Sequence, residues 1–316
     1  MTVEERPAER LTNPRADRVR KVASLAGRSA RQRTGLFLAE GPQAVREALI
    51  AWLARHEVAP EASGLGPDVE AHRDLPLPDA VYFAPGVMAR HGDLAALIER
   101  IHAVLFDPSR ELPRSDRLFL REASEEVIAA MCDAVSPQGI VAVCRIPSAS
   151  PGPELSGCHL TAALCRLQDP GNVGTVIRTA DAAGADAVLL SQGTVDVWSP
   201  KVVRAAAGSH FHLPLVPAAA LADELSALRA AGTQILAAAG EGAVPLAGGD
   251  LPLHRPTLWM FGNEGAGLDA QERALADHAV AVPLYGRAES LNVATAAAVC
   301  LYASAMAQRQ MPGADR

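Results

Sequence analysis

The chain has 316 residues, of which 49% are hydrophobic and 21% are charged. This length exceeds what one hydrophobic core usually serves, so we expect two domains, and the composition excludes a disordered or fibrous protein. The formal net charge of −7 excludes a uniformly basic nucleic-acid coat protein.

The first feature along the chain is a basic segment at residues 10–33. It holds eight cationic residues against a single acid, Asp17, although the chain as a whole is acidic. Such an asymmetry indicates either contact with a polyanion or a solvated helix, and charge alone leaves both interpretations open.

After this segment, the pattern predicts a small mixed α/β domain. Helical apolar spacing occurs at 41–54, 93–104 and 124–134, and strand-like runs occur at 80–83 and 139–144. Residues 60–78, rich in glycine and proline, are expected to form an exposed loop, and IPSASPGP at 146–153 has the composition of a linker. We therefore divide the chain into a basic segment, an α/β domain, a linker and a second domain, at residues 1–35, 36–146, 147–157 and 158–312.

The second domain alternates strand-like runs with helical stretches. The strand-like runs lie at residues 160–165, 187–190, 211–216, 234–239, 257–261 and 279–282. This alternation predicts a mostly parallel sheet covered by helices on both faces. Ligands in such sheets bind beyond the carboxyl ends of the strands, so the loops there are the candidates for a functional site.

Three features bear on the location of the protein. Its five cysteines form no CxxC pair and no metal-ligand spacing with histidine, which predicts reduced, buried thiols in a cytoplasmic protein and no metal site; they are Cys132, Cys144, Cys158, Cys165 and Cys300. Residues 1–10 lack the apolar core of a secretory signal. Residues 291–307 are uncharged but rich in alanine, which favours a buried helix over a membrane span.

The first candidate loop is QDPGNVGTVIRTAD at residues 168–181. Asp-Pro-Gly is typical of a turn, and Asn172 is a suitable N-cap for the following helix. The residues expected to face the sheet are Val173, Val176, Ile177 and Ala180. Arg178 lies outside that stripe, where it could serve a ligand or simply pair with Asp181.

The second candidate loop is FGNEGAGL at residues 261–268. Its glycines follow the order G-x-x-G-x-G, which is not the dinucleotide fingerprint, and no Walker-type phosphate loop occurs in the chain. Closely spaced glycines after a strand let a ligand approach the backbone, although they also suit a plain turn. The embedded Asn263-Glu264 pair favours a ligand loop.

The third candidate loop is VPLYGRAESLNV at residues 282–293. Ser290 is the expected N-cap of the final helix, which would leave Leu291 and Asn292 in its first turn. The free amides there could hold a polar ligand group. An ordinary capped helix would explain Ser290 but would leave Asn292 without a role.

Together, these loops resemble the three motifs of the SpoU (TrmH-like) RNA ribose methyltransferases of the SPOUT superfamily. The matching stretches are DPGNVGTVIRTADAAGA at 169–185, FGNEGAGL at 261–268 and VPLYGRAESLNVATAAA at 282–298, and WSPKVVRAAAGSHFHLPL at 198–215 is also similar. The N-terminal half resembles the family's substrate-binding domain. That likeness lies in RVRKVASLAGRSARQRTGLFLAEGPQAVREAL at 18–49 and SPQGIVAVC at 136–144.

The resemblance implies a fold and an activity. The expected fold is an α/β methyltransferase domain with a C-terminal trefoil knot, preceded by a smaller α/β substrate-binding domain, and knots are rare exceptions to normal chain topology. The expected reaction transfers a methyl group from S-adenosylmethionine to a ribose 2′-hydroxyl of RNA. The resemblance also implies a homodimer with the active site near its interface. The added N-terminal domain favours 23S rRNA as the substrate over tRNA.

Residue roles carry over by position. The expected catalytic group is Arg178, Asn172, Glu264, Ser290 and Asn292, with Arg178 matching the family's catalytic arginine. The expected cofactor-binding residues are Ala239, Phe261, Gly262, Asn263, Gly267, Val282, Leu284, Ser290, Leu291 and Asn292. The residues expected to contact RNA are Arg18, Arg20, Lys21, Arg28, Arg31 and Arg33. Leu284 departs from the methionine common in relatives, a swap of similar volume.

The mechanism that follows is a hypothesis. Arg178 would orient the ribose hydroxyl through a neighbouring phosphate and assist loss of its proton, while Asn172 and Glu264 hold Arg178 in place. Two alternatives stay open: an RNA-binding protein with an inactive methyltransferase domain, and an enzyme that binds a nucleotide phosphate at the glycine loop. The second lacks the expected lysine or dinucleotide fingerprint.

Overall fold

The computed structural model describes residues 10–56, 75–109, 111–147, 155, 157–240, 244–248 and 251–310. The chain forms two compact units. The first unit comprises Met1–Ser148 and Trp198–Phe211, and the second comprises Ala149–Val197 and His212–Arg316. The domain boundary predicted from sequence, near residue 150, places residues 198–211 in the second domain. In the structure these residues pack with the first unit. Most of the linker-like run, at 148–154, lies outside the described residues.

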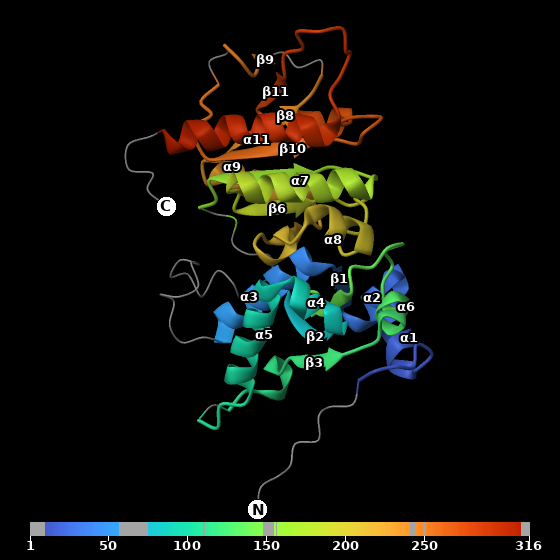
Figure 1. Ribbon diagram of the computed structural model, residues 1–316. Coiled ribbons are helices and arrows are strands. Elements are labelled where there is room, and N and C mark those ends of the chain that lie inside the picture. The colour runs from blue at the N-terminus through green and yellow to red at the C-terminus, as the bar shows by residue number, and fades with distance from the viewer. Residues whose placement is uncertain are drawn as a thin grey trace, which may run out of the picture. The chain divides into compact units, whose positions relative to one another are not determined.

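The first unit is built on a four-stranded sheet in the order β1-β4-β2-β3. The strands are β1 Leu36–Glu40, β2 Leu77–Phe83, β3 Phe119–Glu122 and β4 Ile140–Arg145. β4 is antiparallel to both β1 and β2, and β2 is parallel to β3. The helices of this unit are α1 Asp17–Ala23, α2 Arg28–Thr34, α3 Pro42–His56, α4 Pro85–Arg90, α5 Gly92–Leu105, α6 Glu125–Met131 and α8 Pro200–Ala206 (Figure 1).

Periodicity predicted part of this unit. It predicted α3, α5, α6, β2 and β4 within a few residues, but not the short strands β1 and β3. The prediction of an exposed loop at residues 60–78 is wrong at its C-terminal end, because Leu75 is buried and Pro78 is a buried residue of β2. The rest of that loop, at 57–74, lies outside the described residues.

The segment Trp198–Phe211 is held in the first unit by an ion-pair cluster and by core packing. The Arg204 guanidinium donates from Nη1 to Glu40 Oε2 at 2.9 Å and from Nη2 to Asp133 Oδ2 at 3.0 Å. Glu40 is 8% exposed and also accepts hydrogen bonds from the backbone amides of Asp133 and Ala134. The Trp198 ring lies 4.9 Å from that of Phe37, between ring centroids, and Phe211 is buried in the same core.

The second unit contains a seven-stranded sheet in the order β7-β6-β5-β10-β8-β11-β9. Its strands are β5 Leu160–Leu164, β6 Ala187–Leu190, β7 Leu215–Pro217, β8 Gln234–Ala238, β9 Val244–Pro245, β10 Thr257–Phe261 and β11 His278–Ala281. Its helices are α7 Pro170–Ala183, α9 Leu221–Ala230, α10 Ala270–Ala274 and α11 Val293–Arg309. Neighbouring strands pair in parallel throughout the described part of this sheet, as the alternating pattern predicted.

One strand is misplaced by the sequence pattern. The run at 211–216 was expected to be a strand, but β7 is limited to Leu215–Pro217, because Ser209–Phe211 forms a 3₁₀ turn. The apolar side chain of Phe211, which made this run look like a strand, packs in the core of the first unit.

Successive residues of a strand point to opposite faces of the sheet, and the buried strands of this sheet carry apolar residues on both faces. Helices cover both faces. Leu258 and Met260 of β10 share a core with Leu225 and Leu228 of α9. On the other face, the buried indole of Trp259 donates to Ser304 of α11 at 2.9 Å.

Helices α7 and α11 lie side by side on that second face (Figure 1). Asn292 bonds to Asn172 near their first turns, and the Tyr302 hydroxyl donates to the Ala182 carbonyl near the end of α7. Both pairs are separated by 120 residues, so the two helices run parallel and in step.

The expected buried helix at the C-terminus is α11, and within the described ranges no helix is both long and apolar enough to cross a membrane. None of the five cysteines forms a disulfide; Cys144, Cys165 and Cys300 are buried, while Cys132 and Cys158 are partly exposed. Burial raises the pKa of the Cys165 and Cys300 thiols to about 12, so both stay protonated at neutral pH.

Candidate active site

The candidate site lies at the carboxyl edge of the sheet in the second unit. Leu164 of β5 is in register with Phe261 of β10 and Leu190 of β6, so these strands end together. The chain runs from β5 to β6 on one side, whereas β10 pairs with β5 on the other. A reversal of strand order of this kind is where open α/β sheets bind ligands.

The loop after β5 is shaped by Asp169. Its carboxylate accepts a hydrogen bond from the Asn172 amide at 2.9 Å, and Pro170 is the first residue of α7. The prediction that Asn172 caps this helix is therefore wrong. Proline is favoured in the first helical position, because its missing N–H has no partner there, and the Asp-Pro pair was the available signal. Asn172 stands in the first turn, where its side chain is left to contact other loops.

The loop after β10 closes on itself through Asn263. Its Oδ1 accepts hydrogen bonds from the amides of Gly265 at 3.0 Å and Ala266 at 3.1 Å, and its backbone exchanges two hydrogen bonds with Gly267. A Cβ on Gly262 would lie 2.2 Å from the Leu268 nitrogen, and Gly267 has a φ of +65°. Glycine is required at 262 for the close approach and is favoured at 267 by the left-handed backbone.

Glu264 joins this loop to the loop after β5. Its Oε2 accepts a hydrogen bond from the Gln168 amide at 3.1 Å, and its Oε1 accepts from the Asp169 amide at 2.9 Å and from Asn172 Nδ2 at 3.3 Å. Burial acts to raise the pKa of Glu264, but the amide donors of Asp169 and Gln168 outweigh it, so the pKa lies below its ordinary value. The carboxylate is therefore charged at neutral pH.

Asn292 joins the third loop to the other two. Its Oδ1 accepts hydrogen bonds from the amides of Ala294 at 2.9 Å and Thr295 at 3.4 Å, which makes it the N-cap of α11, while its Nδ2 donates to Asn172 Oδ1 at 3.0 Å. The prediction that Ser290 caps this helix is wrong, since α11 begins at Val293 and Ser290 precedes it on an exposed loop. An asparagine amide can accept from the helix and donate to a neighbour at once, which explains its place here.

The three candidate loops are thus joined by one continuous path, Glu264–Asn172–Asn292. These residues come from three segments far apart in sequence, and hydrogen bonds bring together three of the five expected catalytic residues. Part of the chain is also similar to known proteins. Residues 159–302 match the family model described as SpoU rRNA Methylase family.

Similar proteins cover most of the chain. The chain is 42% identical to the 23S rRNA (guanosine(2553)-2'-O)-methyltransferase RlmP of Bacillus subtilis, over 57% of this chain and 69% of that protein. This chain belongs to the SpoU rRNA methylase family. It is also similar in structure to an AdoMet-bound rRNA methyltransferase from Sinorhizobium meliloti, with 27% identity, a TM-score of 0.70 and coverage of 94% and 97% of the two chains. A TrmH-family RNA methyltransferase structure from Porphyromonas gingivalis gives a TM-score of 0.67 at 27% identity, covering 92% of this chain and 97% of that one.

Arg178, the arginine expected to be catalytic, is exposed on α7. It lies six residues beyond Asn172, roughly 9 Å along the helix axis at ~1.5 Å per residue. The expectation that Asn172 and Glu264 hold Arg178 in place is wrong, because these two residues bond to each other and to loop backbones instead. Asp181 is not its partner either, since Asp181 pairs with His212 at 3.0 Å. Within the described ranges, the Arg178 guanidinium makes no hydrogen bond or ion pair.

The other expected cofactor residues of this SpoU chain follow strands at the same edge. Ala239 follows β8 and donates its amide to the Val280 carbonyl at 2.9 Å. Val282 and Leu284 follow β11, and Leu284 is 40% exposed. Phe261 differs, because its side chain is 1% exposed and only its backbone can face a ligand.

The six basic residues expected to contact RNA differ in their exposure and in their contacts. Arg31 is buried and donates to the Leu25 and Ala26 carbonyls at 2.7 Å, so it is not available to bind a phosphate. Arg18 lies over the Phe119 ring, 4.4 Å from its centroid, and Arg20 pairs with Asp17. The remaining three expected residues, Lys21, Arg28 and Arg33, are exposed.

The substitution Glu264→Gln tests the carboxylate that joins two of the loops. It should lower the free energy of unfolding by about 1 kcal/mol at pH 7, because amide donors lose a charged acceptor that is partly screened by solvent. The folded-state pKa of Glu264 lies below the ordinary 4.5, so its contribution is present above that value and is lost as pH falls through the folded pKa. Urea unfolding from pH 7 to pH 3 measures this difference, which should shrink below about pH 4.5.

The matched control is Glu289→Gln, on the exposed loop before α11, which should change stability by less than about 0.5 kcal/mol. A stability difference between wild type and Glu264→Gln that stayed constant down to pH 3 would contradict the assigned role of the carboxylate.

Proposed function

We propose that this chain transfers the methyl group of S-adenosylmethionine to a ribose 2′-hydroxyl of 23S rRNA in the cytoplasm. The observation that carries the proposal is the Glu264–Asn172–Asn292 path, which gathers the three family motifs at one edge of the sheet. The Bacillus relative is named for 2′-O-methylation of a guanosine in 23S rRNA, and the Sinorhizobium structure is described as AdoMet-bound. The five cysteines, none of which forms a disulfide, suit a reducing compartment.

The residues at this edge fit the cofactor. A Cβ on Gly240, Gly267 or Gly286 would meet nothing within 4 Å, so open space adjoins the backbone in each of three loops. Leu284 and Leu291 expose apolar surface, at 40% and 36%, that an adenosyl group could cover. We propose that the cofactor is held by these two leucines together with Ala239, Phe261, Gly262, Asn263, Gly267, Val282, Ser290 and Asn292.

The protein itself has to supply only part of the chemistry. When bound, the cofactor supplies a methyl group already activated by its sulfonium charge. The chain must therefore align the ribose hydroxyl with that methyl group and assist loss of its proton. Arg178 is an exposed cation with five donors and no acceptor, which suits it to grip a phosphate beside the target ribose and orient the hydroxyl. Asn172, Glu264 and Asn292 keep the loops in register.

The substitution Arg178→Ala tests the reaction. Turnover of 23S rRNA should fall by at least ~100-fold, because alignment of the acceptor is lost, while affinity for S-adenosylhomocysteine stays within about threefold. Transfer of a tritiated methyl group and calorimetry measure the two quantities. The control Arg229→Gln removes another guanidinium of the second unit, which pairs with Asp277, and should leave both unchanged.

Near-normal methylation by Arg178→Ala would refute the role of Arg178. Absence of methyl transfer by the wild-type protein on any RNA would instead favour an inactive RNA-binding relative. Mapping ribose methylation across total RNA, with and without the protein, separates an rRNA from a tRNA substrate. Binding of ATP rather than S-adenosylhomocysteine would favour the phosphate-binding alternative.

We assign RNA contact to the first unit. Lys21, Arg28 and Arg33 extend from α1 and α2 into solvent, and neutralising phosphates with such cations makes binding weaken as salt rises. Arg18 and Arg20 remain partial candidates, because each already contacts a neighbour.

The double substitution Arg28→Gln and Arg33→Gln should reduce RNA affinity without changing cofactor affinity. The slope of log affinity against log salt should become shallower by about 2, since two phosphate contacts are removed. Filter binding between 50 and 300 mM salt measures the slope. The control Arg55→Gln, in the last turn of α3, should leave it unchanged. An unchanged slope in the double variant would place the RNA elsewhere.

The finer features of the fold are also part of the proposal. We propose that the C-terminal segment forms a trefoil knot and that residues 158–312 are the methyltransferase domain, following a basic segment at 1–35, a substrate-binding domain at 36–146 and a linker at 147–157. The likeness of the three motifs to SpoU enzymes supports the knot. Trp198–Phe211 is the exception to this layout, since it packs with the first unit.

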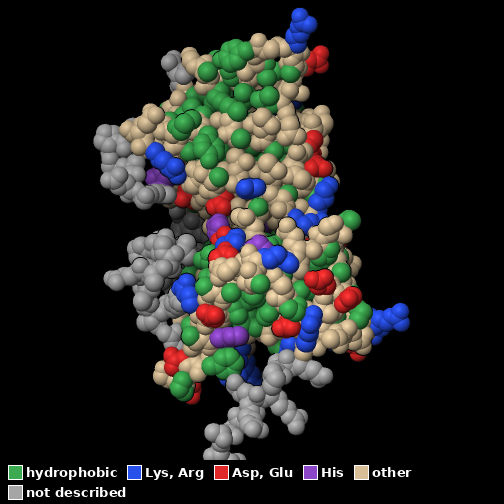
Figure 2. All heavy atoms as spheres, viewed as in Figure 1, with side chains coloured by type: hydrophobic (Ala, Val, Ile, Leu, Met, Phe, Trp, Pro, Cys, Tyr) green, Lys and Arg blue, Asp and Glu red, His purple; other side chains and the backbone are tan. Residues whose placement is uncertain are grey.

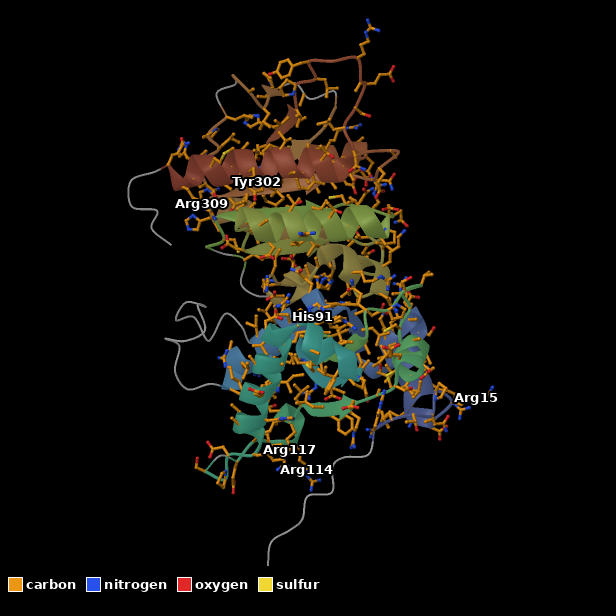
Figure 3. All side chains as sticks on the ribbon, viewed as in Figure 1. Arg15, His91, Arg114, Arg117, Tyr302 and Arg309 are labelled. Carbon is orange, nitrogen blue, oxygen red and sulfur yellow. The ribbon has the colours of Figure 1, made fainter. Side chains whose placement is uncertain are left out.

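We propose a homodimer that uses the outer face of α11. Val299, Tyr302 and Met306 form a helical stripe and are 40%, 41% and 56% exposed. Tyr302 lies along α11 in Figure 3, and Figure 2 shows hydrophobic side chains grouped on the face of the molecule that carries this helix. Such an apolar stripe on a helix is typical of an interface. Since α7 lies beside α11, an interface there would bring Arg178 close to the second protomer.

The double substitution Val299→Glu and Met306→Glu should convert the dimer to a monomer, because it buries two charges in an apolar interface. Sedimentation velocity measures the change. Phe106→Glu offers a matched control, because Phe106 is 70% exposed at the end of α5 in the first unit. A wild-type monomer, or a dimer that survives the double substitution, would exclude this interface.

A further inference from the structure

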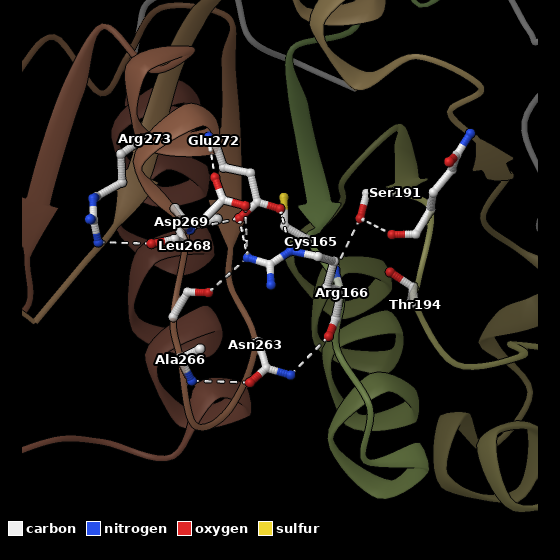
Figure 4. Close-up of polar contacts among 12 residues, drawn as sticks. Cys165, Arg166, Ser191, Thr194, Asn263, Ala266, Leu268, Asp269, Glu272 and Arg273 are labelled. Carbon is white, nitrogen blue, oxygen red and sulfur yellow. Dashed lines mark hydrogen bonds and ion pairs between the residues drawn. The ribbon is translucent and has the colours of Figure 1, made fainter.

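A second polar cluster lies at the carboxyl edge of the same sheet, centred on Arg166 just after β5 (Figure 4). Its guanidinium forms a two-pronged pair with Glu272, from Nε to Oε1 at 2.8 Å and from Nη2 to Oε2 at 2.6 Å. Asp269 Oδ2 lies 3.4 Å from the same Nη2. Parallel paired contacts of this kind fix the direction of the guanidinium as well as its charge.

The backbone of Arg166 is held as firmly as its side chain. Its φ is +58°, in the left-handed region that arginine rarely adopts. Its amide donates to Ser191 Oγ at 3.0 Å, and its carbonyl accepts from Asn263 Nδ2 at 3.0 Å. A strained conformation held by contacts on every side points to a role in shaping the site.

Arg166 contacts both ends of the loop at residues 263–267. Its carbonyl holds Asn263, which itself accepts hydrogen bonds from the Gly265 and Ala266 amides. Its guanidinium lies 3.4 Å from the Gly267 carbonyl at the other end. One residue therefore restrains the whole turn between β10 and α10.

Glu272 provides a fixed anchor for the guanidinium. Its side chain is 11% exposed, and it forms a reciprocal capping box with Asp269 at the start of α10. Hydrogen bonding by Glu272 raises the pKa of Arg166 above its ordinary value, so the guanidinium stays charged. The loop after β10 is thereby tied to both α10 and the end of β5.

Resting on the proposed function, we propose that Arg166 is a positioning residue that sets the conformation of loop 263–267 through Glu272 and so determines affinity for S-adenosylmethionine. Its Nε and Nη2 atoms are directed at Glu272, Asp269 and Gly267, so we assign it to the conformation of the loop and not to the ribose. A loop already held in its binding conformation binds more tightly, because less ordering is required when the ligand arrives.

The test is calorimetry with S-adenosylmethionine alone on full-length Arg166→Gln, at a temperature where circular dichroism shows a folded protein. We expect the Kd to rise by about tenfold, and kcat at saturating cofactor to stay within about twofold of wild type. Arg166→Lys keeps the charge but not the two-pronged geometry, and should recover only part of the affinity. Arg166→Gly, which favours the left-handed backbone but lacks the guanidinium, should bind as weakly as Arg166→Gln.

The matched control is Arg229→Gln. It removes a guanidinium–carboxylate pair of the same unit at the opposite edge of the sheet, where Asp277 accepts from the amide at 235 in β8, and should leave the Kd unchanged. Glu272→Gln should weaken binding to a similar degree. The double variant Arg166→Gln/Glu272→Gln should be no weaker than either single variant, because both remove the same contact.

A Kd within twofold of wild type in folded Arg166→Gln would overturn the proposal, as would an equal loss in Arg229→Gln. A drop in kcat at saturating cofactor with an unchanged Kd would also overturn it. Failure of the proposed function has a different signature, because the wild-type protein would then give no heat of binding with S-adenosylmethionine.

Discussion

The carboxyl edge of the second unit depends on one carboxylate. Glu264 accepts two backbone amides and an asparagine side chain, and through Asn172 it is connected to the cap of the last helix. Backbone donors cannot move away from a charge as a side chain can, so the carboxylate fixes the loop after β5 against the loop after β10. Arg166 holds the same two loops together at a second point, through Asn263 and Gly267.

This arrangement explains why residues expected to do chemistry also build the site. Asn292 caps α11 and bonds to Asn172, while Asn263 closes its own loop and reaches back to Arg166. Of the residues expected to be catalytic, Arg178 faces solvent on a helix and has no hydrogen-bond or ion-pair partner among the described residues. A rigid polar frame beside one uncommitted cation is the arrangement expected of an enzyme that aligns its substrates.

Much of this was predictable from sequence, because the strands of the second unit alternate with helices and the motif residues have recognisable spacing. Both helix starts were placed wrongly, at Asn172 instead of Asp169 and at Ser290 instead of Asn292. At α7 the Asp-Pro pair was a local signal for the cap at Asp169. At α11 capping preference alone could not choose between Ser290 and Asn292, and Asn292 also bonds to Asn172, 120 residues away. Burial of Arg31 and docking of Trp198–Phe211 in the first unit likewise depend on tertiary contacts that no local pattern reveals.

We propose that the three loops form one cofactor site. Hydrogen–deuterium exchange with and without S-adenosylmethionine tests it most directly, because each loop gives its own peptides. The account predicts slower exchange on binding at residues 168–172, 262–267 and 284–292 together, with little change in the first unit. Protection of one loop alone, or no protection at all at saturating cofactor, would contradict it.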